Sequence, residues 1–215
     1  MNTQEKFVIT ISRELGSGGH TIGKKLADRL GVRFCDKELI KELSKRFNLT
    51  PSSIERLKSE KKNWLSDFIT KLYPMPSAGM LGVDSKFTQE FREDVTTDDI
   101  FKAEVEILKG FAEMGSCVIA GRLGFFVFKD HPNKLNVFIT APAQYRIERI
   151  MNKQGLSEEK ASKLIDSIDR SRENYIKRYA GVSRYDARNY DLVMNAEGHS
   201  EEELADLILS YIGQA

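Results

Sequence analysis

The sequence contains little of what marks secreted, membrane-spanning or metal-binding chains. Its two cysteines, Cys35 and Cys117, lie far apart in apolar stretches, which suits buried reduced thiols better than a disulfide framework. The three histidines are scattered and show no metal-ligand spacing. No stretch approaches the roughly 18 apolar residues of a membrane span, and the apolar run behind the polar N-terminus is too short for a signal peptide. We therefore predict a soluble, cytoplasmic protein with no membrane partner.

An excess of charge of one sign is also missing. The chain has 33 basic and 32 acidic residues, a formal net charge of +1, so no overall field favours a nucleic acid polymer or an anionic membrane. Any anion site must therefore be local. With 215 residues, of which 40% are hydrophobic, the chain is long enough to bury a substantial core, and its size fits one α/β domain that carries an insertion.

The apolar patterning predicts an alternation of strands and helices. Five short segments rich in β-branched or aromatic residues are expected to be buried strands: 7–11, 32–36, 117–120, 136–140 and 190–194. Helical patterns occupy 22–30, 98–113, 142–153, 157–179 and 200–212. We expect an α/β fold with a five-stranded parallel sheet and helices on both faces, which binds its ligands at the carboxyl ends of the strands.

Residues 37–97 interrupt this alternation. They combine charged helical sequence with a loop at 73–82, and we interpret them as a helical insertion between the second and third strands. The loop suits a flap over a substrate and equally a loose connection within a helical cover.

The strongest chemical signal is the turn that joins the first strand to the first helix, Ile11-Ser-Arg-Glu-Leu-Gly-Ser-Gly-Gly-His-Thr21. Small residues at 16–19 let successive backbone N–H groups turn inward, and the helix N-terminus adds positive potential, which together suit a phosphate. The predicted binding residues are Gly16, Ser17, Gly18, Gly19, His20 and Thr21. The alternatives are a tight connection or a dinucleotide-binding fingerprint, for which Asp36 is the sole candidate acidic residue.

The segment 11–19 resembles the opening motif of the cytidylate kinase-like family of P-loop nucleoside-monophosphate kinases. Further blocks resemble that family in the same order: Phe34 to Leu39, Gly115 to Arg122, Val137 to Pro142 with Arg146 to Arg149, and Tyr190 to Leu192. The resemblance implies a nucleoside-monophosphate kinase fold in one domain over 1–215, with 37–97 as an acceptor-binding insertion and 150–185 as a helical lid. It also implies ATP and Mg²⁺ as cofactors.

The phosphate loop departs from the P-loop pattern Gly-x-x-x-x-Gly-Lys-Ser/Thr, because the alignment places Arg13 at the first glycine and Gly19 at the lysine. The point charge on the β- and γ-phosphates is therefore missing. From their positions, Arg13, Lys24 or Lys25 could replace it. The resemblance suggests that Thr21 supplies a hydroxyl on the Mg²⁺ side, but a threonine in a first helical turn is often simply a cap-region residue.

Convergent arginines are the next signal, because phosphoryl transfer depends on cations placed around the migrating group. Arg146 and Arg149 lie three residues apart, which places them on one face of a predicted helix. After a break at 154–157, the next helix carries Arg170, Arg172, Lys177 and Arg178. Two basic helices joined at a glycine resemble the lid of nucleoside-monophosphate kinases, and we favour Arg146 and Arg172, together with Arg13, as catalytic residues. The alternative is that these side chains pair with neighbouring glutamates on a solvated surface.

Arg122 directly follows a predicted buried strand, at the edge of the sheet where ligands bind. An arginine there needs an anionic partner. The resemblance points to the phosphate of the acceptor, whereas the alternative is a structural ion pair with a carboxylate such as Asp36. Asp36 itself either orients the acceptor or caps the helix that begins at Lys37.

These features predict ATP- and Mg²⁺-dependent phosphoryl transfer to a nucleoside monophosphate, and the resemblance suggests CMP or dCMP. Two alternatives stay open. A nucleotide-binding regulatory protein on a kinase fold would account for Gly19 in place of the lysine, because a fold does not determine a function. A kinase for another small phosphate ester or alcohol would keep the chemistry and change the acceptor.

Overall fold

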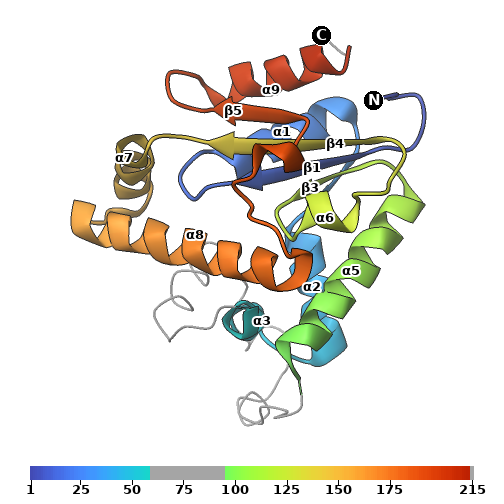
Figure 1. Ribbon diagram of the computed structural model, residues 1–215, viewed down its shortest axis with the longest axis horizontal. Coiled ribbons are helices and arrows are strands. Elements are labelled where there is room, and N and C mark those ends of the chain that lie inside the picture. Colours follow the sequence, from blue (N-terminus) through green and yellow to red (C-terminus); the bar gives the residue numbers. More distant parts are fainter. Residues whose placement is uncertain (59–94, 214–215) are drawn as a thin grey trace, which may run out of the picture. The chain divides into compact units, whose positions relative to one another are not determined.

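The computed structural model of the chain describes residues 1–58 and 95–213. The predicted loop at 73–82 therefore lies outside the described residues. The chain divides into two units, Met1–Asp36 with Lys109–Ala215 and, between them in sequence, Lys37–Leu108. The larger unit contains the sheet (Figure 1).

The sheet has five parallel strands in the order β2-β3-β1-β4-β5. Their bounds are β1 Val8–Arg13, β2 Arg33–Cys35, β3 Cys117–Ala120, β4 Lys134–Thr140 and β5 Leu192–Asn195. Each predicted strand overlaps an observed one, and the predicted five-stranded parallel sheet is confirmed. Because β1 is the central strand, the turn that follows it lies in the middle of the carboxyl edge of the sheet.

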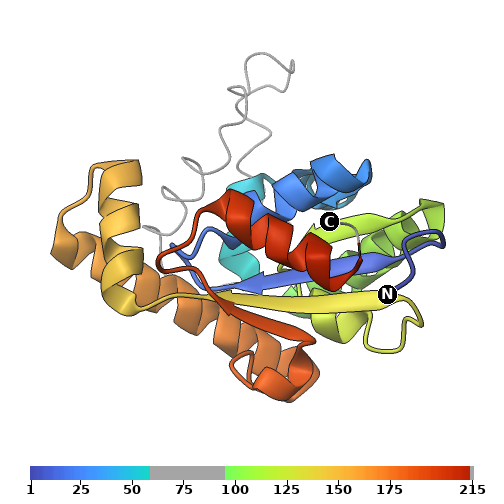
Figure 2. The same cartoon turned by 90° about the horizontal axis from the view of Figure 1, so that it is seen from above.

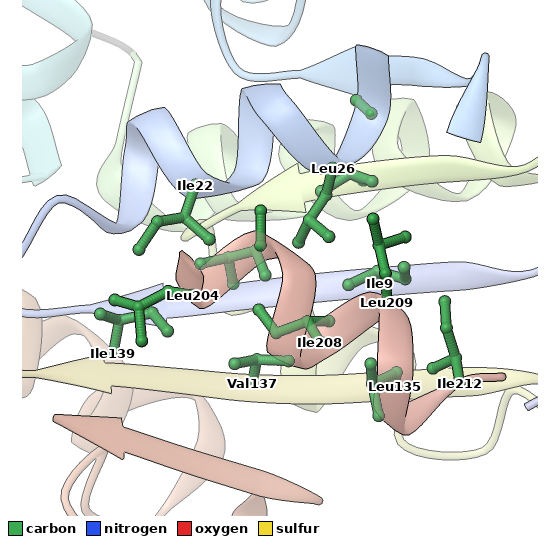
Figure 3. Close-up of a cluster of buried hydrophobic side chains, with 14 of the residues drawn as sticks. Ile9, Ile22, Leu26, Leu135, Val137, Ile139, Leu204, Ile208, Leu209 and Ile212 are labelled. Atoms are coloured by element: carbon green, nitrogen blue, oxygen red, sulfur yellow. The ribbon is translucent and has the colours of Figure 1, made fainter. Parts of the chain in front are cut away.

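One face of the sheet is covered by α1 (Gly19–Leu30) and α9 (Glu201–Tyr211). Their apolar side chains pack against those of β1 and β4, and Figure 3 shows this core. Its labelled members are Ile9, Ile22, Leu26, Leu135, Val137, Ile139, Leu204, Ile208, Leu209 and Ile212. Helix α9 begins with a capping box between Ser200 and Glu203, in which each side chain satisfies a backbone amide of the other.

The opposite face of the sheet carries α6 (Gly124–Val127) and α8 (Glu158–Ala180), as Figure 2 shows for α8. Between them lies an aromatic group in which the rings of Phe138 and Tyr190 stack with centroids 5.1 Å apart. Helix α7 (Ala143–Gln154) connects β4 to α8, and the short 3-10 helix η2 (Ala187–Asn189) precedes β5. Helices therefore cover both faces of the sheet, as predicted.

The observed first helix begins earlier than its pattern indicates, at Gly19 rather than Ile22. Gly18 has a φ of 84° and turns the chain into the helix at once. The apolar periodicity starts only at Ile22, so the polar first turn gives no signal in the sequence. The short elements α6 and η2 were not predicted for the same reason, because four residues or fewer show no period.

The smaller unit contains α2 (Lys37–Phe47), α3 (Pro51–Lys58) and most of α5 (Thr97–Met114). Within it, Lys58 and Glu104 form an ion pair of 2.5 Å, and their side chains are 10% and 2% exposed. Among all the residues described, no helix combines the length and the apolar character that crossing a bilayer requires. Cys35 and Cys117, both in the larger unit, are buried free thiols, as predicted.

Candidate active site

The turn after β1 presents the N-terminal end of a helix at the carboxyl edge of the sheet. Gly16 and Gly18 have φ values of 88° and 84°, in the left-handed region that favours glycine, and α1 begins at Gly19. The amide of Ile22 donates to the carbonyl of Gly18 at 3.1 Å, whereas the amides of residues 19–21 find no acceptor within 1–58 and 95–213. Unpaired amides at the positive end of a helix dipole are the elements of a phosphate site.

Two carboxylates, one partly buried and one buried, hold this turn in place. The side chain of Glu14 accepts hydrogen bonds from the hydroxyl of Thr140 at 2.5 Å and from the amide of Ala141 at 3.3 Å, which joins the turn to the end of β4. The amide of Leu15 donates to Asp169 Oδ1 at 3.0 Å, which joins the turn to α8. The turn is therefore fixed by its own protein contacts.

Asp169 also gathers three arginines from separate segments. Its carboxylate lies 2.7 Å from Arg146, 3.3 Å from Arg172 and 3.5 Å from Arg184. Arg172 and Arg184 both donate to the backbone carbonyl of Arg13 as well, at the end of β1. Among the described residues, these three guanidinium groups outnumber the two carboxylates that pair with them, Asp169 and Glu14, the latter 3.5 Å from Arg146. The surplus of positive charge beside the phosphate turn suits an anionic ligand.

The three arginines differ in their access to solvent. The side chains of Arg184 and Arg146 are 2% and 11% exposed, whereas that of Arg172 is 31% exposed. Arg146 also donates to the carbonyls of Ala141 at 3.0 Å and Leu15 at 3.3 Å. Arg146 and Arg184 therefore form part of the framework of the site, and Arg172 is the member of the three that a ligand can reach most easily.

The structure thus brings together both arginines that the sequence favoured, Arg146 and Arg172. The other basic residues predicted on α8, namely Arg170, Lys177 and Arg178, are exposed. Lys177 pairs with Glu173 at 3.1 Å, which agrees with the solvated-surface alternative for that residue.

Sequence reasoning missed Arg184 and the central position of Asp169. Both are buried charged residues, which seldom occur without a partner. The one local signal is the spacing of Asp169 and Arg172, three residues apart on α8. Arg184 lies in a non-helical connection, so no periodic pattern indicates where it points. Arg149, predicted on the same helix face as Arg146, pairs with Glu201 of α9 at 2.5 Å.

A second charged group lies at the carboxyl ends of β2 and β3. Asp36 is fully buried, and its carboxylate lies 2.8 Å from His20 Nε2 and 3.6 Å from Arg122 Nη2. Burial by itself raises the pKa of Asp36, but the hydrogen bond from His20 and the positive charges of Arg122 and Arg13 outweigh it and hold the pKa well below its usual range. The ion pair between Arg122 and Asp36, the alternative interpretation of Arg122, is therefore present.

An unusual backbone positions Arg122. Gly121, Arg122 and Leu123 have φ values of 76°, 59° and 53° in succession. The left-handed region costs a non-glycine residue of the order of 1 kcal/mol, and such strain tends to occur at functional sites. This turn directs the chain from β3 into α6 and leaves the Arg122 guanidinium beside Asp36, with its side chain 8% exposed.

The three candidates to replace the missing lysine lie in different places. Lys24 and Lys25 pair with carboxylates of α1 and α9 at 2.7 and 2.5 Å. The Arg13 side chain instead passes over Gly19 of the phosphate turn, and its guanidinium reaches Gly121 at the end of β3. Of the three positions, that of Arg13 suits a phosphate-binding cation best.

The side chains around the turn fit a magnesium ion that arrives with a nucleotide. Within 1–58 and 95–213, no group of three or more His, Cys, Asp or Glu residues is arranged to hold a metal by itself. Mg²⁺ in phosphotransferases is usually held by one or two protein groups together with substrate phosphates and water. Thr21, in the first turn of α1, provides a hydroxyl next to the unpaired amides.

Comparison with known proteins gives a family match over most of the chain. The model of the cytidylate kinase-like family matches residues 8–198. The cytidylate kinase of Sulfolobus acidocaldarius is 25% identical over 207 residues, which are 96% of this chain and 94% of that protein. The cytidylate kinase of Pyrococcus horikoshii is also 25% identical, over 97% of this chain and 90% of that protein.

Solved structures with the same fold include an uncharacterized protein from Eubacterium ventriosum, with a TM-score of 0.68 and 23% identity over 97% of this chain and 99% of that one. A shikimate kinase from Bacteroides thetaiotaomicron has a TM-score of 0.54 and 16% identity, over 96% and 98% of the two chains. At these identities the likeness concerns the fold.

Proposed function

Since the chain belongs to the cytidylate kinase-like family, we propose that it transfers a phosphoryl group from ATP to a nucleoside monophosphate, and that the acceptor is CMP or dCMP. The observation that carries the proposal is the set of unpaired amides at the start of α1, with the Asp169 arginine cluster on the β4 side and Asp36 with Arg122 on the β2–β3 side. This arrangement offers one place for the donor phosphates and a second place for an anionic acceptor.

On the donor side, the turn formed by Gly16, Ser17, Gly18, Gly19, His20 and Thr21 binds the phosphates of ATP through backbone amides. The Thr21 hydroxyl would help to hold Mg²⁺, which would supply positive charge to neutralise the phosphates. Phosphoryl transfer needs mainly alignment and positive charge around the migrating group. In this proposal Arg172 supplies that charge. Arg146 holds the phosphate turn and Asp169 in place, and Asp169 in turn orients Arg172.

On the acceptor side, Arg122 holds the phosphate of the monophosphate, and Asp36 orients the acceptor through its ion pair with Arg122. Two features support this assignment. Arg122 lies at the end of the strand next to β1, where open α/β sheets bind ligands, and several relatives of this chain are named cytidylate kinases. We further propose that residues 37–97 act as the acceptor-binding insertion and residues 150–185 as the lid.

The test is a product assay with Mg-ATP and a panel of purine and pyrimidine nucleoside monophosphates. Formation of CDP or dCDP as the favoured product supports the proposal. Nucleotide binding without any turnover favours the second candidate, a regulatory protein on a kinase fold. The observation behind this alternative is that Gly19 replaces the loop lysine. Turnover of another phosphate ester or alcohol would keep the reaction class and overturn the acceptor.

A further inference from the structure

Gly19 is a glycine because its surroundings leave no space for a side chain. A Cβ atom at position 19 would lie 2.5 Å from Arg13 Cβ, a distance at which one of the two residues has to move. The backbone of Gly19 is helical and does not belong to the glycines with positive φ. An alanine or a lysine at position 19 is therefore compatible with the backbone and incompatible with the Arg13 side chain.

The Arg13 side chain extends toward the acceptor side of the turn. Its Nη1 atom would lie 1.8 Å from a Cβ atom placed on Gly121, so the guanidinium rests against the backbone at the end of β3. The carbonyl of Arg13 accepts hydrogen bonds from Arg172 and Arg184, at the Asp169 arginine cluster. Residue 13 thus lies at the boundary between the two charged groups, with its own charge directed to the group that contains Asp36.

We propose that this phosphate turn has exchanged its cation: the Cβ of Arg13 excludes any side chain, and so a lysine, at position 19, and the Arg13 guanidinium supplies a positive charge to the phosphate of the acceptor in place of a lysine charge on the donor phosphates. The identity of that acceptor rests on the function proposed above. Arg13 and Arg122 together place two guanidinium groups on this side of the turn, and paired guanidinium groups suit the dianionic phosphate of a monophosphate ester. A lysine at position 19 would instead lie on the donor phosphates.

The steric part of the proposal is tested by thermal unfolding of the wild type and five variants. Gly19→Ala should lower Tm by about 3–10 °C in the wild-type background, because overpacking outweighs the gain in helix propensity. In the Arg13→Gly background the same substitution should leave Tm unchanged or raise it. The matched control is Arg13→Ala, which retains Cβ, so Arg13→Ala/Gly19→Ala should still lose stability relative to Arg13→Ala. An equal change in Tm on Gly19→Ala in the wild-type, Arg13→Gly and Arg13→Ala backgrounds would overturn the proposal that residue 13 excludes a side chain at position 19.

The charge is tested by calorimetric titration of ATP and CMP separately. Arg13→Ala should weaken CMP binding roughly 10- to 100-fold, as expected for one charge-assisted contact, and ATP binding by less than about 3-fold. Lys25→Ala, which removes a positive charge that pairs with Glu202 on the surface, should change neither. A loss of ATP affinity as large as the loss of CMP affinity would place Arg13 on the donor phosphates and overturn the acceptor role.

The two experiments also separate this inference from the proposed function. If the wild-type protein binds neither ATP nor CMP, the proposed function fails and the acceptor role of Arg13 fails with it. The dependence of position 19 on position 13 is decided by unfolding alone, whatever the protein binds.

Discussion

The guanidinium of Arg146 on α7 lies 2.7 Å from the carboxylate of Asp169 on α8, and both side chains are buried. The same arginine donates to the carbonyl of Leu15, while Asp169 accepts from the amide of Leu15. The two members of this ion pair therefore bind the carbonyl and the amide of the same residue of the phosphate turn. Its removal affects first the fold and then the chemistry.

We expect Arg146→Ala to destabilise the protein by about 1.5–3 kcal/mol, because the buried Asp169 carboxylate loses its shortest ion-pair contact while Arg172 and Arg184 stay beside it. Denaturant-induced unfolding measures this. Arg188→Ala is the matched control, since Arg188 pairs with Asp186 but is 90% exposed, and its loss should change the free energy of unfolding by less than about 0.5 kcal/mol. Similar small effects of both substitutions would show that the buried pair does not stabilise the turn.

Arg172→Ala should leave the fold largely intact and lower kcat by roughly 10³-fold, because a cation that meets the migrating phosphoryl group stabilises the transition state more than the ground state. Arg170→Ala, two residues away and exposed, should retain kcat. The double variant Arg146→Ala/Arg172→Ala should be little worse in turnover than either single variant, because residues that act as a unit are strongly non-additive. Near-wild-type kcat for Arg172→Ala would assign this residue to the surface.

Arg122→Ala should weaken the binding of the acceptor and leave ATP binding nearly unchanged, since the guanidinium lies beside Asp36 at the ends of β2 and β3. Loss of a charge-assisted contact corresponds to roughly 10- to 100-fold in affinity. Separate equilibrium titrations with CMP and ATP measure the two effects. Equal losses for both ligands would contradict the division between a donor side and an acceptor side.

The low pKa of Asp36 predicts a specific pH dependence of stability. Because the pKa is lower in the folded state than in the unfolded state, where it is about 3.9, the carboxylate stabilises the fold above that pH, and this contribution is lost as the pH falls toward the folded-state value. Between about pH 5 and pH 3, the wild type should therefore lose more free energy of unfolding than Asp36→Asn. Parallel pH profiles for the two proteins would contradict the assigned environment of Asp36.

Much of the fold follows from the sequence alone, because the relevant signals are local. The β-branched run at 117–120 coincides with β3, and the long amphipathic pattern at 157–179 coincides within one residue with α8. Alternating strands and helices require a parallel sheet covered on both faces. The glycine-rich turn after the central strand could also be placed, since its position at the carboxyl edge depends only on the strand before it and the helix after it.

The tertiary structure alone decided which charged groups meet. Asp169 and Arg184 lie 15 residues apart in sequence, and Arg13 and Gly19 face each other across a turn, so no period of 2 or 3.6 residues relates the members of either pair. The partner of a charged side chain depends on how segments pack. The residue type does not reveal whether an arginine is buried, like Arg146, or partly exposed, like Arg172. The sequence by itself determined the sheet and the place of its phosphate turn. The packing of α7, α8 and the residues before η2 determined which arginines support that turn and which can reach a ligand. The physical reason is that only contacts between distant segments decide whether a charged side chain is buried.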